Sequence, residues 1–257
     1  MQISAVSKEI NEWSGSVLIA GILEGTIESQ ITLFKTIIKD TYLSQRFSDA
    51  KFEGKKSQKL SIELIEGKIK KIVFVGLGKA ENLLIDDLRK AASIGTRQVV
   101  GYERKLGIFF PWDAFDPSSA AFAVGEAISL TSIKDLRFKS EQKESTPLEK
   151  VELIGLDDKV VELAIAEINP ICEGVKFARE LVSAPPNFLT PSQLAIEAGK
   201  LATTYDLDLK ILDKKGCEDE AMGAYLAVAK GSALEPNFIH LKYSPKIAKN
   251  KVVLIGK

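Results

Sequence analysis

Side chains that commonly carry out catalysis are sparse in this sequence of 257 residues. There is one histidine, His240, and there are two cysteines, Cys172 and Cys217. A zinc site built from imidazole and thiolate groups needs roughly four ligands, so any metal site here would have to use carboxylate or carbonyl oxygens. His240 could act as a base or a ligand, but a lone histidine in an alternating, strand-like segment is more often a hydrogen-bonded structural side chain.

Two short clusters resemble binding sites without completing one. Gly76-Leu77-Gly78 lies after an apolar run and before an amphipathic segment, where a dinucleotide fingerprint begins, but Glu81 occupies the place of the third glycine. We interpret it as a tight turn from strand to helix. The acidic run at residues 218–220 could bind a cation, but acidic residues also favour the first turn of a helix, and we prefer that interpretation.

The composition limits the classes of partner. Lysine plus arginine and aspartate plus glutamate each number 35, so the net charge is zero, which argues against a nucleic-acid-binding protein. No apolar run is long enough to span a bilayer, and residues 1–13 lack the apolar core of a signal peptide. Sparse cysteines are typical of a reducing compartment, so we expect two free thiols in a cytoplasmic protein without a membrane partner.

The first half alternates strand-like and helix-like patterns. Apolar and β-prone runs predict strands at 16–23, 59–65, 70–75, 106–110 and 151–156. Periodic apolar residues predict helices at 82–100 and 116–130, the second with Asp116 as its N-cap and Pro117 at its first position. The short connection at 66–68 makes the second and third strands a hairpin, so we expect an α/β fold with a mixed sheet.

The second half looks incomplete as a domain. We expect two helices within 158–183, because a proline such as Pro170 costs about 3 kcal/mol inside a helix and Asn169 could cap a second one. A helix beginning at Thr190-Pro191 and a short one near Glu218 follow. Strands are expected at 207–212, 224–229, 238–243 and 251–255. Few helices remain to cover these strands, so their apolar faces would stay open.

Four segments in order resemble the leucyl aminopeptidase (cytosol aminopeptidase) family. ARELVSAPPNFLTP at 178–191 is similar to the segment that opens the catalytic domain of that family, although Ser183-Ala184 replaces its usual Asn-Thr. MGAYLAVAKGS at 222–232, FIHLKY at 238–243 and VLIGK at 253–257 resemble the next three segments. GLGK at 76–79 and LRF at 136–138 are similar to the N-terminal domain of the family.

The resemblance implies a fold and an activity. It implies a macro-domain-like α/β domain with a mixed sheet at 1–157, connecting helices at 158–183, and a truncated start of an α/β metallopeptidase domain at 184–257. Members of the family release N-terminal residues such as leucine from peptides with two divalent metal ions, Mn²⁺ or Zn²⁺, and form homohexamers.

Lys257 is the residue in this chain to which the resemblance assigns a role, that of a metal ligand. An ordinary lysine has a pKa of about 10.4 and offers no lone pair, so only a nearby dication could remove its proton. The carboxylate ligands and catalytic side chains of the family follow this position, so we expect this chain alone to be inactive. The alternative is a nucleotide- or ADP-ribose-binding or oligomerisation module without peptidase chemistry, which the incomplete glycine turn and neutral charge disfavour.

Overall fold

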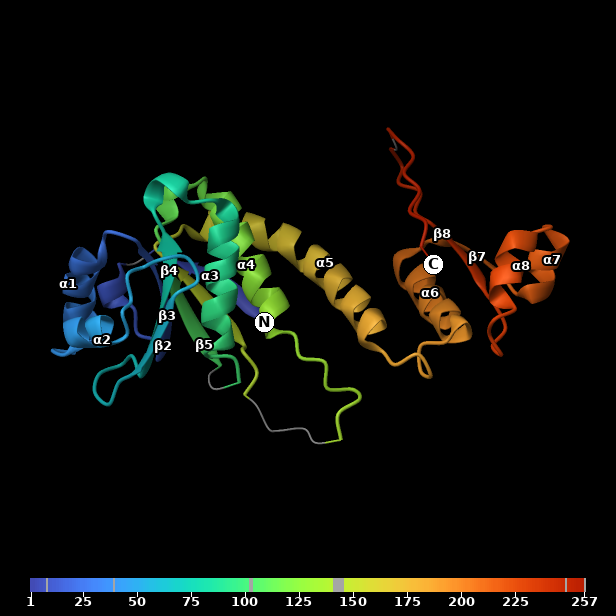
Figure 1. Ribbon diagram of the computed structural model, residues 1–257. Helices are drawn as coiled ribbons and strands as arrows, with labels where there is room; N and C mark the ends of the chain where they lie inside the picture. Colours follow the sequence, from blue (N-terminus) through green and yellow to red (C-terminus); the bar gives the residue numbers. More distant parts are fainter. Residues whose placement is uncertain (8, 39, 102–103, 141–145, 248, 257) are drawn as a thin grey trace. The chain divides into compact units, whose positions relative to one another are not determined.

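The structure is a computed structural model that describes every residue except 8, 39, 102–103, 141–145, 248 and 257 (Figure 1). The chain divides into two compact units, Met1–Arg179 and Glu180–Lys257. Among the helices of the described residues, none has the length and apolar character that crossing a membrane requires.

The first unit is built on a six-stranded mixed sheet with the order β1-β6-β5-β2-β4-β3. All neighbouring pairs are parallel except β3 and β4, which form the predicted antiparallel hairpin. The strands are β1 (Gln2–Val6), β2 (Val17–Leu23), β3 (Lys59–Glu63), β4 (Lys71–Gly78), β5 (Lys105–Phe109) and β6 (Lys150–Ile154). The predicted α/β class with a mixed sheet is therefore confirmed, although the sequence analysis missed β1.

Helices cover both faces of this sheet, as Figure 1 shows. In β2, Val17 and Ile19 belong to the core shared with the helices α3, α4 and α5, whereas Leu18 and Ala20 belong to the core shared with α1 and α2. The helices are α1 (Ile27–Ile38), α2 (Leu43–Asp49), α3 (Ile85–Arg97), α4 (Pro117–Ser132) and α5 (Asp158–Ser183). Burial on both faces explains why the central strands are continuous apolar runs.

Helix α4 begins as its sequence predicts. The Asp116 carboxylate accepts a hydrogen bond from the backbone N–H of Ser119 at 2.9 Å, and Pro117 is the first helical residue. Proline fits there because its missing N–H would have no partner within the helix. The expected helix at 82–100 is shorter in the structure, where a 3₁₀ turn, Ala80–Asn82, precedes α3.

Helix α5 differs from the prediction for residues 158–183. It runs without a break from Asp158 to Ser183 and contains Pro170, where we expected two helices. Its buried residues are Val161, Ala164, Ile168 and Cys172. This stripe continues past the proline at helical spacing, so burial of one apolar face outweighs the roughly 3 kcal/mol that a proline costs inside a helix.

The second unit contains α6 (Pro191–Tyr205), β7 (Asp208–Leu212), α7 (Lys214–Asp219), α8 (Gly223–Ala229) and β8 (Phe238–Lys242). Strands β7 and β8 form an antiparallel pair. The expected strand at 224–229 is wrong, because these residues form α8; a short apolar run fits a strand or a helix equally, and its three alanines favour the helix. The expected strand at 251–255 is also wrong, because these residues are irregular and exposed.

Candidate functional site

The one predicted metal ligand, Lys257, lies outside the described residues. The four segments that carry the family resemblance otherwise have defined places in the structure. Residues 178–191 span the end of α5, a turn and the start of α6, while residues 222–232 contain α8. Residues 238–243 contain β8, and residues 253–256 are irregular.

The proline-rich turn before α6 is explained by its own hydrogen bonds. The carbonyl oxygen of Pro185 accepts from the backbone N–H groups of Phe188 and Leu189, both at 2.9 Å. The Thr190 hydroxyl oxygen then accepts from the Gln193 N–H at 3.2 Å and caps α6, as the sequence predicted. The turn at Pro185 and the cap at Thr190 therefore fix where α6 begins.

Two of the resemblance segments contact each other directly. The Tyr225 hydroxyl of α8 donates a hydrogen bond to the carbonyl oxygen of Asn237 at 2.9 Å, and its ring packs edge-on against Phe238 with the centroids 6.0 Å apart. Burial raises the pKa of the Tyr225 hydroxyl, and the nearby Cys217 raises it further. The tyrosine is therefore a neutral structural link between α8 and β8.

The other polar candidates in this unit do not form a reactive site. His240 is exposed on β8, opposite Lys210 of β7. Glu218 and Asp219 end α7 where we expected them to begin a helix, so stabilisation by the helix dipole was the wrong explanation. The Glu220 carboxylate instead accepts a hydrogen bond from the Lys210 ammonium at 3.0 Å. Within the described part of the chain, no three His, Cys, Asp or Glu side chains are grouped to hold a metal ion.

The Gly76-Leu77-Gly78 segment ends β4, and the loop at residues 54–56 packs against it. A Cβ atom at Gly76 would lie 2.0 Å from the carbonyl oxygen of Lys55, and Gly78 has a φ of +81°. The Gly78 N–H donates to the carbonyl of Gly54 at 2.8 Å. Both glycines are thus required by close backbone approach and turn geometry, in agreement with the interpretation as a tight turn.

The carboxyl end of the sheet is also filled by the protein. The connections from β2 and β5 leave in opposite directions along the sheet, and ligands of open α/β sheets bind at such a point. A Cβ atom at Gly21 would lie 2.8 Å from both Leu77 and Phe110. The Trp112 indole N–H donates to the carbonyl of Ile154 at 2.6 Å. These contacts place the protein's own side chains at this end of the sheet and weigh against the nucleotide-binding alternative.

Glu152 is a buried carboxylate with three partners. It accepts hydrogen bonds from the Trp13 indole at 2.8 Å and from the ammonium groups of Lys150 at 2.9 Å and Lys105 at 3.1 Å. Burial alone would raise its pKa, but the hydrogen bonds from Lys150, Trp13 and Lys105 outweigh burial and lower the pKa. The group is therefore a charged structural anchor that holds the segment before β2 on the sheet.

Asp87, on α3, is the second buried carboxylate of this unit. Its Oδ2 accepts from the Lys56 ammonium at 2.6 Å and from the backbone N–H of Leu84 at 2.9 Å. Burial would raise the pKa of Asp87, but the hydrogen bond from Lys56 and then that from Leu84 reverse the shift. It fixes the loop that covers Gly76 and Gly78, and it is not available as an acid or base near neutral pH.

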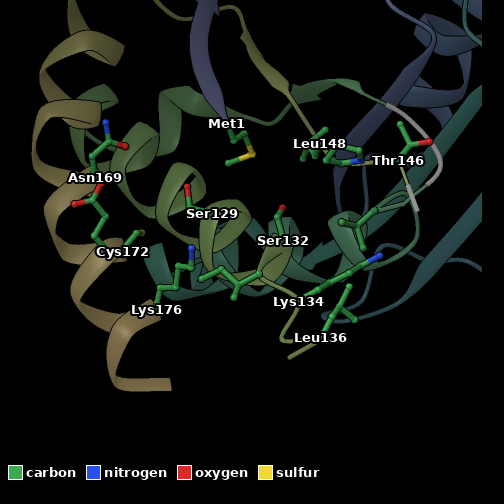
Figure 2. A pocket seen from close by; sticks show the side chains of 14 residues that line it. Met1, Ser129, Ser132, Lys134, Leu136, Thr146, Leu148, Asn169, Cys172 and Lys176 are labelled. Atoms are coloured by element: carbon green, nitrogen blue, oxygen red, sulfur yellow. The ribbon is translucent and has the colours of Figure 1, made fainter. Parts of the chain in front are cut away.

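A cavity of about 480 Å³ lies in the first unit beside α5 (Figure 2). Its lining residues come from Met1, α4, α5, and the segments that follow α3, follow α4 and precede β6: Met1, Val100, Ser129, Ser132, Ile133, Lys134, Leu136, Thr146, Pro147, Leu148, Asn169, Cys172, Glu173 and Lys176. Burial, and secondarily the charge of Glu126, raises the pKa of the Cys172 thiol. Cys172 is therefore a neutral thiol and a poor nucleophile. Cys217 is likewise a free, buried cysteine.

The structure thus defines an α/β unit whose mixed sheet is covered by helices on both faces, followed by a second unit of helices and a strand pair. Two family models match it: the N-terminal domain of the cytosol aminopeptidase family over residues 21–142, and the catalytic domain of the same family over residues 176–257. The chain belongs to the cytosol aminopeptidase family, and the predicted resemblance is confirmed.

Sequence similarity to curated proteins covers the whole chain. A probable cytosol aminopeptidase of Prochlorococcus marinus (strain MIT 9211) is 46% identical over 258 residues, and one of Synechococcus sp. (strain CC9311) is 38% identical over 261 residues. Each comparison covers 100% of this chain and 52% of the relative, so the chain spans about half the length of these curated relatives. A solved structure of a tomato leucine aminopeptidase mutant has a TM-score of 0.82 at 27% identity, covering 98% of this chain and 52% of that one.

Proposed function

We propose that this chain forms the N-terminal part of a metallo-aminopeptidase that releases N-terminal residues, such as leucine, from peptides. The supporting observation is that two models of one family, for its N-terminal and its catalytic domain, match in order along the chain. In this proposal residues 1–157 are the N-terminal domain, 158–183 the connecting helix, and 184–257 the start of the catalytic domain.

Two divalent metal ions, Mn²⁺ or Zn²⁺, are part of this proposal. A structural relative at 24% identity, a bottromycin maturation enzyme, was solved in complex with Mn. The described residues do not form such a centre by themselves, because no three of their His, Cys, Asp or Glu side chains lie close enough together to hold a metal ion. We therefore assign only Lys257 as a ligand and attribute no reaction step to the described residues.

The remaining parts of the proposal concern location and assembly. A cytoplasmic location is supported by the name cytosol aminopeptidase that the relatives carry and by a sequence with two free cysteines. A homohexamer and substrates with a free N-terminus are proposed from the family resemblance. The nucleotide-binding alternative is disfavoured, because Leu77 and Phe110 pack against Gly21 and Trp112 donates a hydrogen bond to Ile154 at the carboxyl end of the sheet.

Substitution of Lys257 in the protein expressed from its complete gene tests the ligand assignment. Lys257→Ala removes a metal ligand, so hydrolysis of a leucine chromogenic amide is expected to fall by about 100-fold, with less metal retained on dialysis. Lys257→Arg is expected to fare no better, because a guanidinium cannot lose its proton to coordinate a metal. Lys251→Ala, an exposed lysine of the same segment, is the matched control. Near-normal activity of Lys257→Arg would refute the assignment.

A polypeptide of residues 1–257 alone is expected to be inactive. The reason is the lack of a group of metal-ligating side chains in the described part of the chain. The assay adds Mn²⁺ or Zn²⁺ and follows the same chromogenic amide against a blank without protein. Turnover above the blank that a chelator abolishes would contradict this expectation, while titration with ADP-ribose tests the alternative directly.

A further inference from the structure

Helix α5 is held to the first unit unevenly along its length. Its buried residues are Val161, Ala164, Ile168 and Cys172, so burial stops in the middle of the helix. The residues from Glu173 onward are exposed or half-buried. Only the first half of α5 is therefore fixed by an apolar face, and the second half depends on other contacts.

Two residues weaken the helix at the point where burial stops. Pro170 has no N–H to donate to the carbonyl of Ala166, one turn earlier. Gly174 follows one turn later, and a Cβ atom added there would have no neighbour within 4 Å. Packing therefore does not require glycine at this position, and glycine lowers the stability of a helix compared with alanine. A proline and an unconstrained glycine four residues apart are a local weak point.

The same part of α5 borders the cavity of about 480 Å³ (Figure 2). Asn169, Cys172 and Lys176 line it from α5, and Ser129 and Ser132 line it from α4. Cys172 has a hydrogen bond with Ser129 of α4, and the next lining residues of α5, Glu173 and Lys176, border the open space of the cavity.

Further along α5, beyond the cavity, a second hydrogen bond to α4 is seen among the described residues. The Arg179 guanidinium donates to the carbonyl oxygen of Leu130 at 2.9 Å. Leu130 lies in the last turn of α4, where carbonyl groups lack partners within the helix and attract a positive charge. Arg179 is exposed, so water competes for this contact and the bond can open and close readily.

We propose that residues 169–174 form a hinge in α5, and that Arg179 is a clasp that holds the half-helix after the hinge over the cavity. When the clasp opens, residues 175–179 move away from the end of α4 and the hinge uncovers Cys172, which lies within it. When it closes, Cys172 is covered again. The proposal concerns only contacts within the first unit and does not depend on peptidase activity.

Alkylation of the two cysteines by iodoacetamide, followed by mass spectrometry of the intact chain under native conditions, measures this motion. Arg179→Ala removes the clasp and is expected to raise the rate at Cys172 about 3- to 10-fold. Gly174→Ala strengthens the helix at the hinge and is expected to lower the rate about 5-fold. Cys217, buried in the second unit, is the internal reference and is expected to keep its rate.

The matched control is Arg104→Ala, which removes an exposed arginine of the same unit that pairs with Glu149 at 2.7 Å. It is expected to leave the rate at Cys172 unchanged. Equal rates in Arg179→Ala and Arg104→Ala would overturn the clasp, and an unchanged rate in Gly174→Ala would overturn the hinge. A parallel rise at Cys172 and Cys217 would indicate general unfolding and would overturn both.

Discussion

Replacement of Glu152 by glutamine measures how much the buried carboxylate stabilises the first unit. Glu152 is 6% exposed and contacts the Lys150 and Lys105 ammonium groups at 2.9 and 3.1 Å. Glutamine keeps the shape and can still accept from Trp13, but it loses the charge that the lysines require. Because both lysine side chains are 41% exposed, we reduce each contact to about 1 kcal/mol and expect a loss of about 2 kcal/mol in the free energy of unfolding.

Urea unfolding followed by tryptophan fluorescence is the suitable assay. Both tryptophans of the chain, Trp13 and Trp112, lie in the first unit, so the signal reports that unit alone. With a slope of about 2 kcal/mol/M, the midpoint of Glu152→Gln should fall by about 1 M. Glu149→Gln is the control, because Glu149 is 54% exposed in its pair with Arg104 and should cost under about 0.5 kcal/mol. Equal midpoints for the two variants would refute the reasoning.

The lowered pKa of Glu152 predicts that the stability difference between wild type and Glu152→Gln depends on pH. The folded pKa of Glu152 is lowered below an unfolded value of about 4.3. The stabilisation is therefore fully present above the unfolded pKa and is lost as the pH falls through the folded pKa. The difference between wild type and Glu152→Gln should stay constant from pH 7 to about pH 5 and shrink below about pH 4. A difference that grows on acidification would contradict the direction of the shift.

Three further outcomes are expected. Gly76→Ala should lower the unfolding free energy by about 3 kcal/mol, because its Cβ would lie 2.0 Å from a backbone carbonyl oxygen. Gly67→Ala should lower it by only about 1–2 kcal/mol, because Gly67 has a φ of +87° but no neighbour within 4 Å. Urea unfolding of both variants measures this difference. Residues 252–255 are 77–93% exposed, so the chain should self-associate, and Leu254→Lys should shift it toward monomer in light scattering. Limited proteolysis should trim the chain within 169–186, and resistance of the whole chain as one unit would contradict this.

Much of the first unit could be predicted from the sequence, because local signals and tertiary packing agree there. The apolar run of β2 and the Asp116-Pro117 cap of α4 each specify one structure. Strand β1 was missed because QISAV is short and half polar, and its pairing with β6 joins residues far apart in the chain. Pro170 misled the prediction because its cost is local, while the burial that outweighs it is tertiary.

The candidate site was predictable in a different way. Lys257 was assigned from its place in a family segment, and its surroundings stay untested because it lies outside the described residues. The role of Gly76 was only half visible in the sequence. The turn was predicted, but the loop that packs on it approaches from residues 54–58, and no local pattern indicates that contact.

The pairing of β1 with β6 has a consequence for synthesis on the ribosome. Gln2 pairs with Lys150 and Val6 with Ile154, so β1 is translated long before its partner strand β6. At about 5–20 residues per second, β1 waits roughly 7–30 s while the rest of the sheet is translated. The inner strands β2 and β4 can pair earlier. The sheet then gains strands at its sides until β1 pairs with β6 at one edge. Nascent chains halted before and after β6 emerges should therefore differ sharply in their resistance to protease.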